Sequence, residues 1–278
     1  MSKSNGNGNG NGNSSSGAGV VGLSALFASA RDAGTISPAT TGIITGSLGA
    51  VVIAGAAGKD ADDIVASDVT LVTLLIDASS SIHQRGLEDA VREGQNMLVD
   101  ALSQSRERDS MLMALWTFND ELRVVHSYVG VDDVTRLDAR SYQAAGCTRL
   151  YDAWCDALAA NVAYAQRLRD AGTPCKSVVV IVTDGEDVGS RRLVSDCASL
   201  SRDLLASEQF TLAFVGVGTD VDFHAVARAM GVPDGNVTVQ AQATPSGLRK
   251  VFRMVSQSAI RASQGLVRPG RATGFFAP

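Results

Sequence analysis

Side chains that carry hard oxygen ligands are concentrated in three short segments of this 278-residue sequence. The first segment has the pattern D-x-S-x-S and contains Asp77, Ser79 and Ser81, and the other two contain Thr148 and Asp184. Together they offer carboxylates and hydroxyls, with no soft ligand among them. Mg²⁺ and Mn²⁺ prefer such donors, and Mg²⁺ commonly keeps positions open to water. If the segments meet in the folded chain, we expect a Mg²⁺ site, or a Mn²⁺ site, with room for one further anionic oxygen.

The elements around these segments predict how they are brought together. Continuous apolar runs, typical of strands buried on both faces of a parallel sheet, occupy residues 69–76, 177–182 and 210–217. We expect a hairpin from residues 111–118 and 122–129, a last strand at 236–239, and helices at 87–102, 150–168, 193–204, 223–230 and 245–262. This alternation predicts an α/β fold, a doubly wound, Rossmann-like, mainly parallel six-stranded sheet with one antiparallel edge strand and helices on both faces. Ligands bind such sheets beyond the carboxyl ends of the strands, where Asp77 and Asp184 fall.

Composition divides the chain into four parts. Residues 1–19, rich in Gly, Asn and Ser, are expected to be a disordered leader, residues 20–67 a helical extension, residues 68–263 the main domain, and residues 264–278 a flexible basic tail. In the extension, a short helix is expected at 23–33, and Ser37 and Pro38 have the types expected at the start of a second. Residues 35–58 carry no charge, but their many Gly, Ser and Thr and the acidic residues that follow argue against a membrane span. We expect this stretch to pack on the main domain.

Charge and cysteine usage narrow the function classes. The formal net charge of −5 argues against a nucleic-acid partner. The four cysteines form no C-x-x-C pair, which indicates reduced thiols rather than disulfides or a zinc site. The first residues do not have the basic and apolar regions of a secretory signal. We therefore expect a cytoplasmic protein.

The three segments resemble the metal-ion-dependent adhesion site of von Willebrand factor A domains. The resemblance rests on D-x-S-x-S from Asp77, G-x-T-x-L-Y-D-A from Gly146 and T-D-G-E-D from Thr183, and it covers about residues 69–262. It implies that the metal is held, directly or through water, by Asp77, Ser79, Ser81, Thr148 and Asp184. It also implies that the metal captures an Asp or Glu side chain of a partner protein and performs no catalysis. Many prokaryotic members of the family act beside an AAA-type ATPase, which the resemblance suggests as a setting.

Residues next to the ligands are candidates for contact with the partner. Ser80 stands where the family frequently has glycine, and Cys147 replaces the glycine that is common before the threonine. These departures remove no oxygen ligand but bear on loop conformation and partner choice. The full set of candidate partner-contacting residues is Ser80, Cys147, Arg149, Glu186, Phe275 and Phe276. The last two tip the basic tail, which is either a short docking peptide or a frayed terminus.

Rival interpretations also follow from the residues. A strand that ends in an aspartate is found in phosphoryl-transfer enzymes with an aspartate nucleophile, but those enzymes carry a second aspartate two residues later. This chain has Ser79 there, and its hydroxyl does not titrate near neutrality, so we expect no enzyme activity. Taken singly, Ser79 or Ser81 could cap the next helix, and Asp184 with Gly185 could form a simple turn.

Three versions of a binding role compete. The version favoured by the cysteines and the start of the chain is a cytoplasmic adaptor. The second is an extracellular or surface adhesion module. The third is a structural role in which the site binds a neighbouring copy of the same chain.

Overall fold

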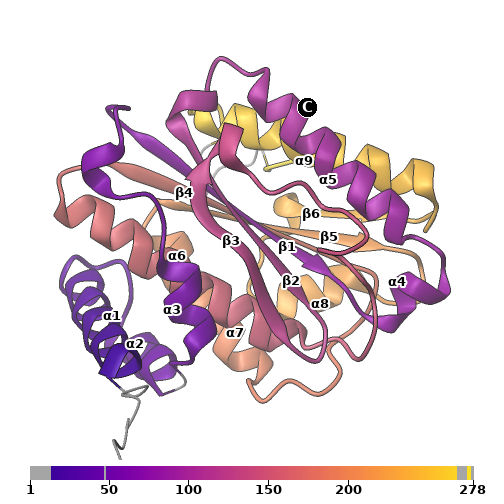
Figure 1. Ribbon diagram of the computed structural model, residues 1–278. Helices are drawn as coiled ribbons and strands as arrows, with labels where there is room; N and C mark the ends of the chain where they lie inside the picture. The colour runs from indigo at the N-terminus through magenta and orange to yellow at the C-terminus, as the bar shows by residue number, and fades with distance from the viewer. Residues whose placement is uncertain (1–13, 47, 268–273, 277–278) are drawn as a thin grey trace, which may run out of the picture.

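A six-stranded sheet forms the centre of the computed structural model, which describes residues 14–46, 48–267 and 274–276 (Figure 1). The strand order is β3-β2-β1-β4-β5-β6, and only β3 runs antiparallel to its neighbour. The strands are β1 (Val69–Asp77), β2 (Met111–Phe118), β3 (Leu122–Gly130), β4 (Cys175–Thr183), β5 (Phe210–Val217) and β6 (Val237–Gln240). The predicted fold class is therefore confirmed, including the antiparallel edge.

The central strand β1 shows why the apolar runs in the sequence are continuous. All nine of its residues are buried. Leu71 and Leu75 face one hydrophobic core, whereas Val72 and Leu74 face the other. Because successive side chains of a strand point to opposite faces, a strand covered on both sides needs apolar residues at nearly every position.

Helices cover both faces of this sheet (Figure 1). The helices α6 (Leu150–Asp170), α7 (Val194–Ala206) and α8 (Phe223–Ala229) pack on one face, and α5 (Glu88–Ser103) and α9 (Pro245–Ser263) lie on the other. The short α4 (Ser80–Gln84) follows β1 directly. Because β1 and β4 are parallel, their carboxyl ends reach the same edge of the sheet, where α4 and the loop after β4 begin.

The N-terminal extension consists of α1 (Ser14–Asp32), α2 (Pro38–Thr45) and α3 (Ala50–Ala56). The predicted cap of α2 is confirmed, since Ser37 Oγ accepts a hydrogen bond from Thr40 N at 3.2 Å. The helix α1 begins at Ser14, inside the segment expected to be a disordered leader, because an established helix propagates into neighbouring residues at little cost. Residues 1–13 of that leader lie outside the described residues.

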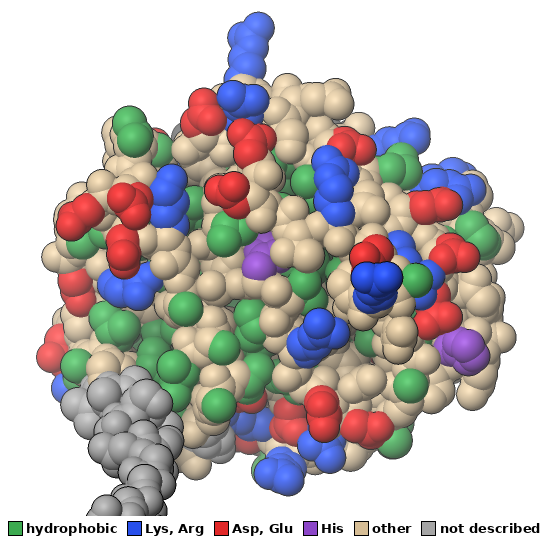
Figure 2. All heavy atoms as spheres, viewed as in Figure 1, with side chains coloured by type: hydrophobic (Ala, Val, Ile, Leu, Met, Phe, Trp, Pro, Cys, Tyr) green, Lys and Arg blue, Asp and Glu red, His purple; other side chains and the backbone are tan. Residues whose placement is uncertain are grey.

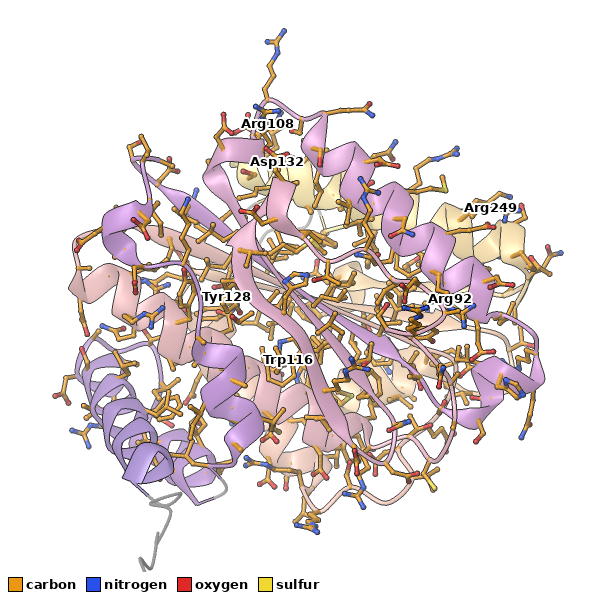
Figure 3. The ribbon with its side chains drawn as sticks, in the orientation of Figure 1. Arg92, Arg108, Trp116, Tyr128, Asp132 and Arg249 are labelled. Atoms are coloured by element: carbon orange, nitrogen blue, oxygen red, sulfur yellow. The ribbon has the colours of Figure 1, made fainter. Side chains whose placement is uncertain are left out.

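The extension packs on α6 and on the edge of the sheet at β3. A Cβ at Gly55 would lie 2.0 Å from the Trp116 ring, so only glycine lets α3 approach β2 this closely. Tyr128 of β3 stacks on Tyr164 of α6 with ring centroids 4.4 Å apart. Figure 3 shows the labelled Trp116 and Tyr128 where α3 meets the sheet. This packing confirms the expectation that the uncharged stretch lies on the main domain.

The described residues contain no single helix with the length and hydropathy needed to cross a membrane. Only α2 and α3 taken together reach that threshold, across a bend of 115°. On the face shown in Figure 2, charged side chains of both signs are spread widely, and hydrophobic side chains gather over the region of α3.

The C-terminal aromatic residues correct one prediction. Phe275 was expected in a flexible tail, either a docking peptide or a frayed terminus, but its side chain is 0% exposed and belongs to the core between the sheet and α9. Its backbone N donates to Asn236 Oδ1 at 2.7 Å, and Arg261 Nη2 donates to its carbonyl at 3.1 Å. Phe276 is half-buried beside it. Burial of a large aromatic side chain outweighs the entropy of a free terminus here.

Replacing Phe275 with alanine should therefore destabilise the whole domain. We expect a loss of about 3–5 kcal/mol in the free energy of unfolding, the range for a buried phenylalanine, measured by urea denaturation. Phe276→Ala is the matched control and should cost clearly less, because Phe276 is only partly buried. Equal effects of the two substitutions would contradict the assignment of Phe275 to the core.

Candidate metal centre

Asp77 is buried at the carboxyl end of β1, and both of its carboxylate oxygens accept hydrogen bonds. Oδ1 accepts from Ser79 N at 2.8 Å, and Oδ2 accepts from Thr183 Oγ1 at 2.5 Å. Thr183 is the last residue of β4, which pairs with β1. The two adjacent strand ends therefore fix the carboxylate without using a cation of the protein.

Ser79, Ser81 and Asp184 form a continuous chain of contacts. Ser79 Oγ lies 3.0 Å from Ser81 Oγ, and Ser81 Oγ donates to Asp184 Oδ1 at 2.6 Å. Ser79 occupies the N-cap position of α4 but makes no capping bond with its side chain. The structure thus disfavours the interpretation of Ser79 as a mere helix cap, because its hydroxyl is turned toward the other oxygen donors.

Thr148 is brought to these residues by the tip of the β2–β3 hairpin. Asp120 Oδ1 accepts from Cys147 N at 3.1 Å, and the Asn119 carbonyl accepts from Arg149 N at 3.2 Å. Thr148 itself is buried, and its Oγ1 lies 3.4 Å from the position that a Cβ at Gly185 would take. Asp120, which the sequence indicated only as a turn former, therefore holds the loop that carries one of the candidate ligands.

The loop after Asp184 is tied to the start of α6. Val188 N donates to the Thr148 carbonyl at 2.7 Å, and Asp187 Oδ1 accepts from Tyr151 N at 3.1 Å. In return, Asp152 Oδ1 accepts from Arg192 N at 2.9 Å. These reciprocal bonds fix the Thr148 segment and the Asp184 segment relative to each other.

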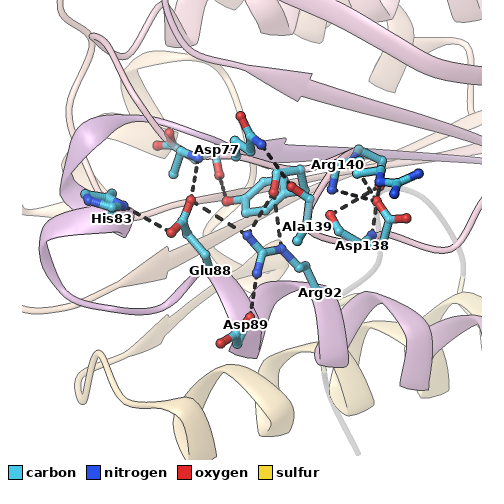
Figure 4. Close-up of polar contacts among 12 residues, drawn as sticks. Asp77, His83, Glu88, Asp89, Arg92, Asp138, Ala139 and Arg140 are labelled. Carbon is cyan, nitrogen blue, oxygen red and sulfur yellow. Dashed lines mark hydrogen bonds and ion pairs between the residues drawn. The ribbon is translucent and has the colours of Figure 1, made fainter.

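Glu88 and Arg92 of α5 and Tyr142 form a polar cluster that contacts the end of β1 (Figure 4). Tyr142 Oη donates to the Asp77 carbonyl at 2.5 Å, and Arg92 donates to the Tyr142 carbonyl from Nε at 3.2 Å and from Nη2 at 3.0 Å. Glu88 Oε1 accepts from Ala144 N at 2.8 Å, and this bond is the main reason that the pKa of Glu88 is lowered. The cluster holds residues 142–144 against the end of β1.

Burial is the main influence on the pKa values of the two candidate carboxylate ligands, Asp77 and Asp184. Burial raises the pKa of Asp77 to about 6; repulsion from Asp184 adds to the effect, and the Thr183 and Ser79 hydrogen bonds oppose it. Burial likewise raises the pKa of Asp184, opposed by Ser81 and by Arg85. The Arg85 Nη1 atom lies 3.2 Å from Asp184 Oδ2. The folded chain therefore concentrates negative charge that its own groups only partly compensate.

This arrangement fits a hard divalent cation. Asp184 Oδ2 is buried and has no hydrogen-bond partner, so one carboxylate oxygen is left for another ligand. Within the described ranges, no group of three or more His, Cys, Asp or Glu side chains could hold a metal by itself. A cation held here would therefore need oxygen donors besides the two carboxylates, and the hydroxyls beside them suit Mg²⁺ or Mn²⁺ better than a soft metal.

The candidate partner-contacting residues separate into two groups. Cys147 and Glu186 are exposed, and Ser80 and Arg149 are half-buried, around the five candidate ligands. Phe275 and Phe276 lie elsewhere, because Phe275 binds Asn236, which precedes the amino end of the parallel strand β6. They are therefore at the edge of the sheet opposite the site. The neighbouring Asp120 side chain raises the pKa of the Cys147 thiol, which lowers its thiolate fraction and its nucleophilicity.

Several residues that shape the site carried no recognisable sequence signal. Glu88, Arg92 and Tyr142 act through contacts between segments 50 to 65 positions apart. Arg85 meets Asp184 across 99 positions. An acidic residue at a hairpin tip, such as Asp120, is the one weak hint that the sequence offered.

Comparisons with known proteins agree with this fold. The von Willebrand factor type A domain profile matches residues 72–253. Among solved structures, the PilB minor pilin from Streptococcus sanguinis is 12% identical, with a TM-score of 0.51 over 74% of this chain and 64% of that chain. The pilus adhesin SpaC from Lactobacillus rhamnosus GG is 11% identical, with a TM-score of 0.52 over 70% of this chain and 30% of that chain. At these identities the similarity shows the fold alone.

A lower-scoring match is proximal thread matrix protein 1 from the mussel byssus, whose structure with a zinc-occupied MIDAS motif is 19% identical with a TM-score of 0.48. That match covers 69% of this chain and 46% of that protein, so this chain spans less than half of its length. Among curated proteins, no sequence matches this chain.

The raised pKa of Asp77 predicts a pH-dependent stability of the metal-free protein. An unfolded aspartate has a pKa of about 3.9, so between pH ~4 and ~6 the folded state binds more protons than the unfolded state. The free energy of unfolding should therefore fall as pH rises through this range, by an amount on the order of 3 kcal/mol from Asp77.

The variant Asp77→Asn removes this contribution. In EDTA it should match the wild type near pH 4 and exceed it in stability near pH 7, as measured by urea unfolding at both pH values. Other titrating groups, including Asp156, whose pKa burial raises to about 6, are common to both proteins and cancel in the comparison. A difference between the two proteins that does not change with pH would refute the prediction.

Proposed function

The chain belongs to the von Willebrand factor type A domain family, and on this premise we propose that it binds a partner protein through Mg²⁺, or Mn²⁺ in its place. The proposed ligands are Asp77, Ser79, Ser81, Thr148 and Asp184. The observation that carries the proposal is the buried Asp184 Oδ2, which has no hydrogen bond although the Oδ1 atom of the same carboxylate accepts one from Ser81.

Each residue type has a defined task in this proposal. Asp77 and Asp184 supply the negative charge that attracts a divalent cation, and the hydroxyls of Ser79, Ser81 and Thr148 supply neutral oxygen donors. When bound, the ion offers a Lewis-acidic position to a carboxylate oxygen of a partner's Asp or Glu. Ser80, Cys147, Arg149 and Glu186 surround that position and are proposed to contact the partner.

Binding rather than catalysis follows from the groups around the site. Ser79 stands where an acid–base carboxylate would be needed, and the Cys147 thiol is held away from its thiolate form. We propose a cytoplasmic adaptor, in keeping with the four free cysteines, and an AAA-type ATPase as a candidate partner system. Fractionation of the host cell that finds the protein outside the cytoplasm would instead support an adhesion module.

Metal binding can be measured without knowing the partner. Asp77→Ala should abolish the binding of Mg²⁺ and Mn²⁺ in isothermal titration, because it removes one of only two carboxylates. Thr148→Ala should weaken binding about tenfold or more, and Thr148→Ser should largely preserve it because the hydroxyl remains.

The matched control for metal binding is Asp132→Ala. Asp132 is an exposed acidic residue that follows β3, at the opposite edge of the sheet, and its removal changes the net charge by the same amount (Figure 3). Unaltered affinity in Asp77→Ala would refute the metal site.

Partner capture should depend on the same ion. Immobilised wild-type protein should retain its partner from an extract of its native host in Mg²⁺ and release it in excess EDTA, and Asp77→Ala should retain none under either condition. Light scattering of the purified chain with and without EDTA distinguishes a separate partner from self-association. Retention that is insensitive to EDTA and to Asp77→Ala would contradict a metal-mediated contact.

A further inference from the structure

Arg85 lies between two acidic side chains at the rim of the metal centre. It follows α4, and its Nη1 atom is 3.2 Å from Asp184 Oδ2, while its Nη2 atom donates to Asp220 Oδ2 at 2.7 Å. The Arg85 side chain is 27% exposed, whereas that of Asp220 is 75% exposed and that of Asp184 is fully buried. One guanidinium group therefore links the interior of the site to the surface.

The two contacts of Arg85 differ in kind. The contact with Asp220 is a charge-assisted hydrogen bond, but neither Arg85 Nη1 nor Asp184 Oδ2 has a hydrogen-bond partner. Toward Asp184, Arg85 thus supplies positive charge without the directional bond that would hold it there. Moving the guanidinium away from Asp184 breaks no hydrogen bond, and Asp220 keeps it attached to the rim.

The backbone around the site provides room for this guanidinium. Gly218, just after β5, has φ +110°, and a Cβ there would lie 3.1 Å from Arg85 Nη1. A side chain at position 218 would therefore crowd Arg85 in addition to straining the backbone. The space that Arg85 occupies is thus left open by the fold at the end of a third strand.

We propose that Arg85 is a tethered competitor of the divalent cation for Asp184 Oδ2, and that it sets the metal concentration at which the site fills. This inference rests on the proposed metal-binding function. A cation at Oδ2 meets the like charge of the guanidinium at close range, so it binds only as Arg85 withdraws toward Asp220. In the metal-free chain, the same guanidinium partly neutralises the buried Asp184.

The test is isothermal titration of Mg²⁺ and Mn²⁺ into the wild type, four variants and a control variant. Arg85→Gln should bind metal about tenfold more tightly than the wild type, because the competing charge is gone. Asp220→Asn should bind more weakly, because Arg85 loses its outer attachment and stays on Asp184. Arg85→Lys keeps the charge and should stay near the wild-type affinity.

The double variant Arg85→Gln/Asp220→Asn separates competition from a general effect of charge. If Asp220 acts through Arg85, its substitution should change metal affinity little once Arg85 is glutamine, whereas a long-range field would act equally in both backgrounds. The control is Arg108→Gln, which removes an exposed arginine at the amino end of β2, opposite the site, and should leave affinity unchanged (Figure 3).

A second measurement uses stability instead of metal affinity. In EDTA, Arg85→Gln should lower the melting temperature, because Asp184 loses its charged neighbour, and saturating Mg²⁺ should restore most of the difference. If Arg85→Gln fails to fold, Asp220→Asn is compared with Asp222→Asn, which removes the same charge from an exposed residue that caps α8. Equal effects of these two substitutions on metal affinity would overturn the role of Arg85.

The outcomes distinguish the two proposals. Wild-type metal affinity in Arg85→Gln, or an Asp220→Asn effect that is equal in both backgrounds, overturns the role of Arg85 while leaving the metal site intact. Absence of metal binding in the wild type, or its survival in Asp77→Ala, overturns the proposed function itself.

Discussion

Burial of Asp77 and Asp184 at the ends of the neighbouring strands β1 and β4 is the constraint on which the rest of the site depends. Taking a carboxylate out of water is unfavourable unless hydrogen bonds or an opposite charge compensate for it. The protein supplies hydrogen bonds to three of the four carboxylate oxygens, from Ser79 N, Thr183 Oγ1 and Ser81 Oγ. Near the fourth oxygen, Asp184 Oδ2, the protein places one positively charged side chain, that of Arg85. The remaining excess of negative charge is what a divalent cation would neutralise.

The loops around these carboxylates are held in place mainly by backbone groups. Ser80 N donates to the Gly146 carbonyl, and Ala145 N donates to the Ala78 carbonyl, so the segments after β1 and before α6 are joined directly. Glu88 and Asp120 each add a carboxylate that accepts a backbone N–H of the second segment. Because both segments are fixed to the sheet, the ligands keep their relative positions without a metal. A site whose ligands are held in place in this way favours a small ion with a strict coordination geometry, such as Mg²⁺, over a larger ion that accepts varied geometries.

The sequence predicted the parts of this structure that depend on local pattern. The strands β1, β4 and β5 were recognisable because burial on both faces requires continuous apolar residues, and Asp77 and Asp184 could be placed because each directly follows such a run. The contacts of Arg85 and Asp120 could not be predicted, because they join segments far apart in the chain through single side chains. Phe275 was misjudged for a related reason. A short aromatic segment after a basic, Gly- and Pro-containing stretch has the composition of a free tail, and only the folded structure shows that Phe275 packs into the core beside α9.

The ligands that the sequence predicts and the residues that reach the site through long-range contacts differ in what they contribute to the proposed function. The locally encoded oxygen donors decide which class of ion fits, because hydroxyl and carboxylate chemistry is the same wherever the segments come from. Under the proposed function, the long-range contacts would set how strongly the ion is held, since Arg85 lies beside Asp184 and Asp120 holds the Thr148 loop. On this proposal, substitution at Arg85 or Asp220 would alter metal affinity without removing a ligand.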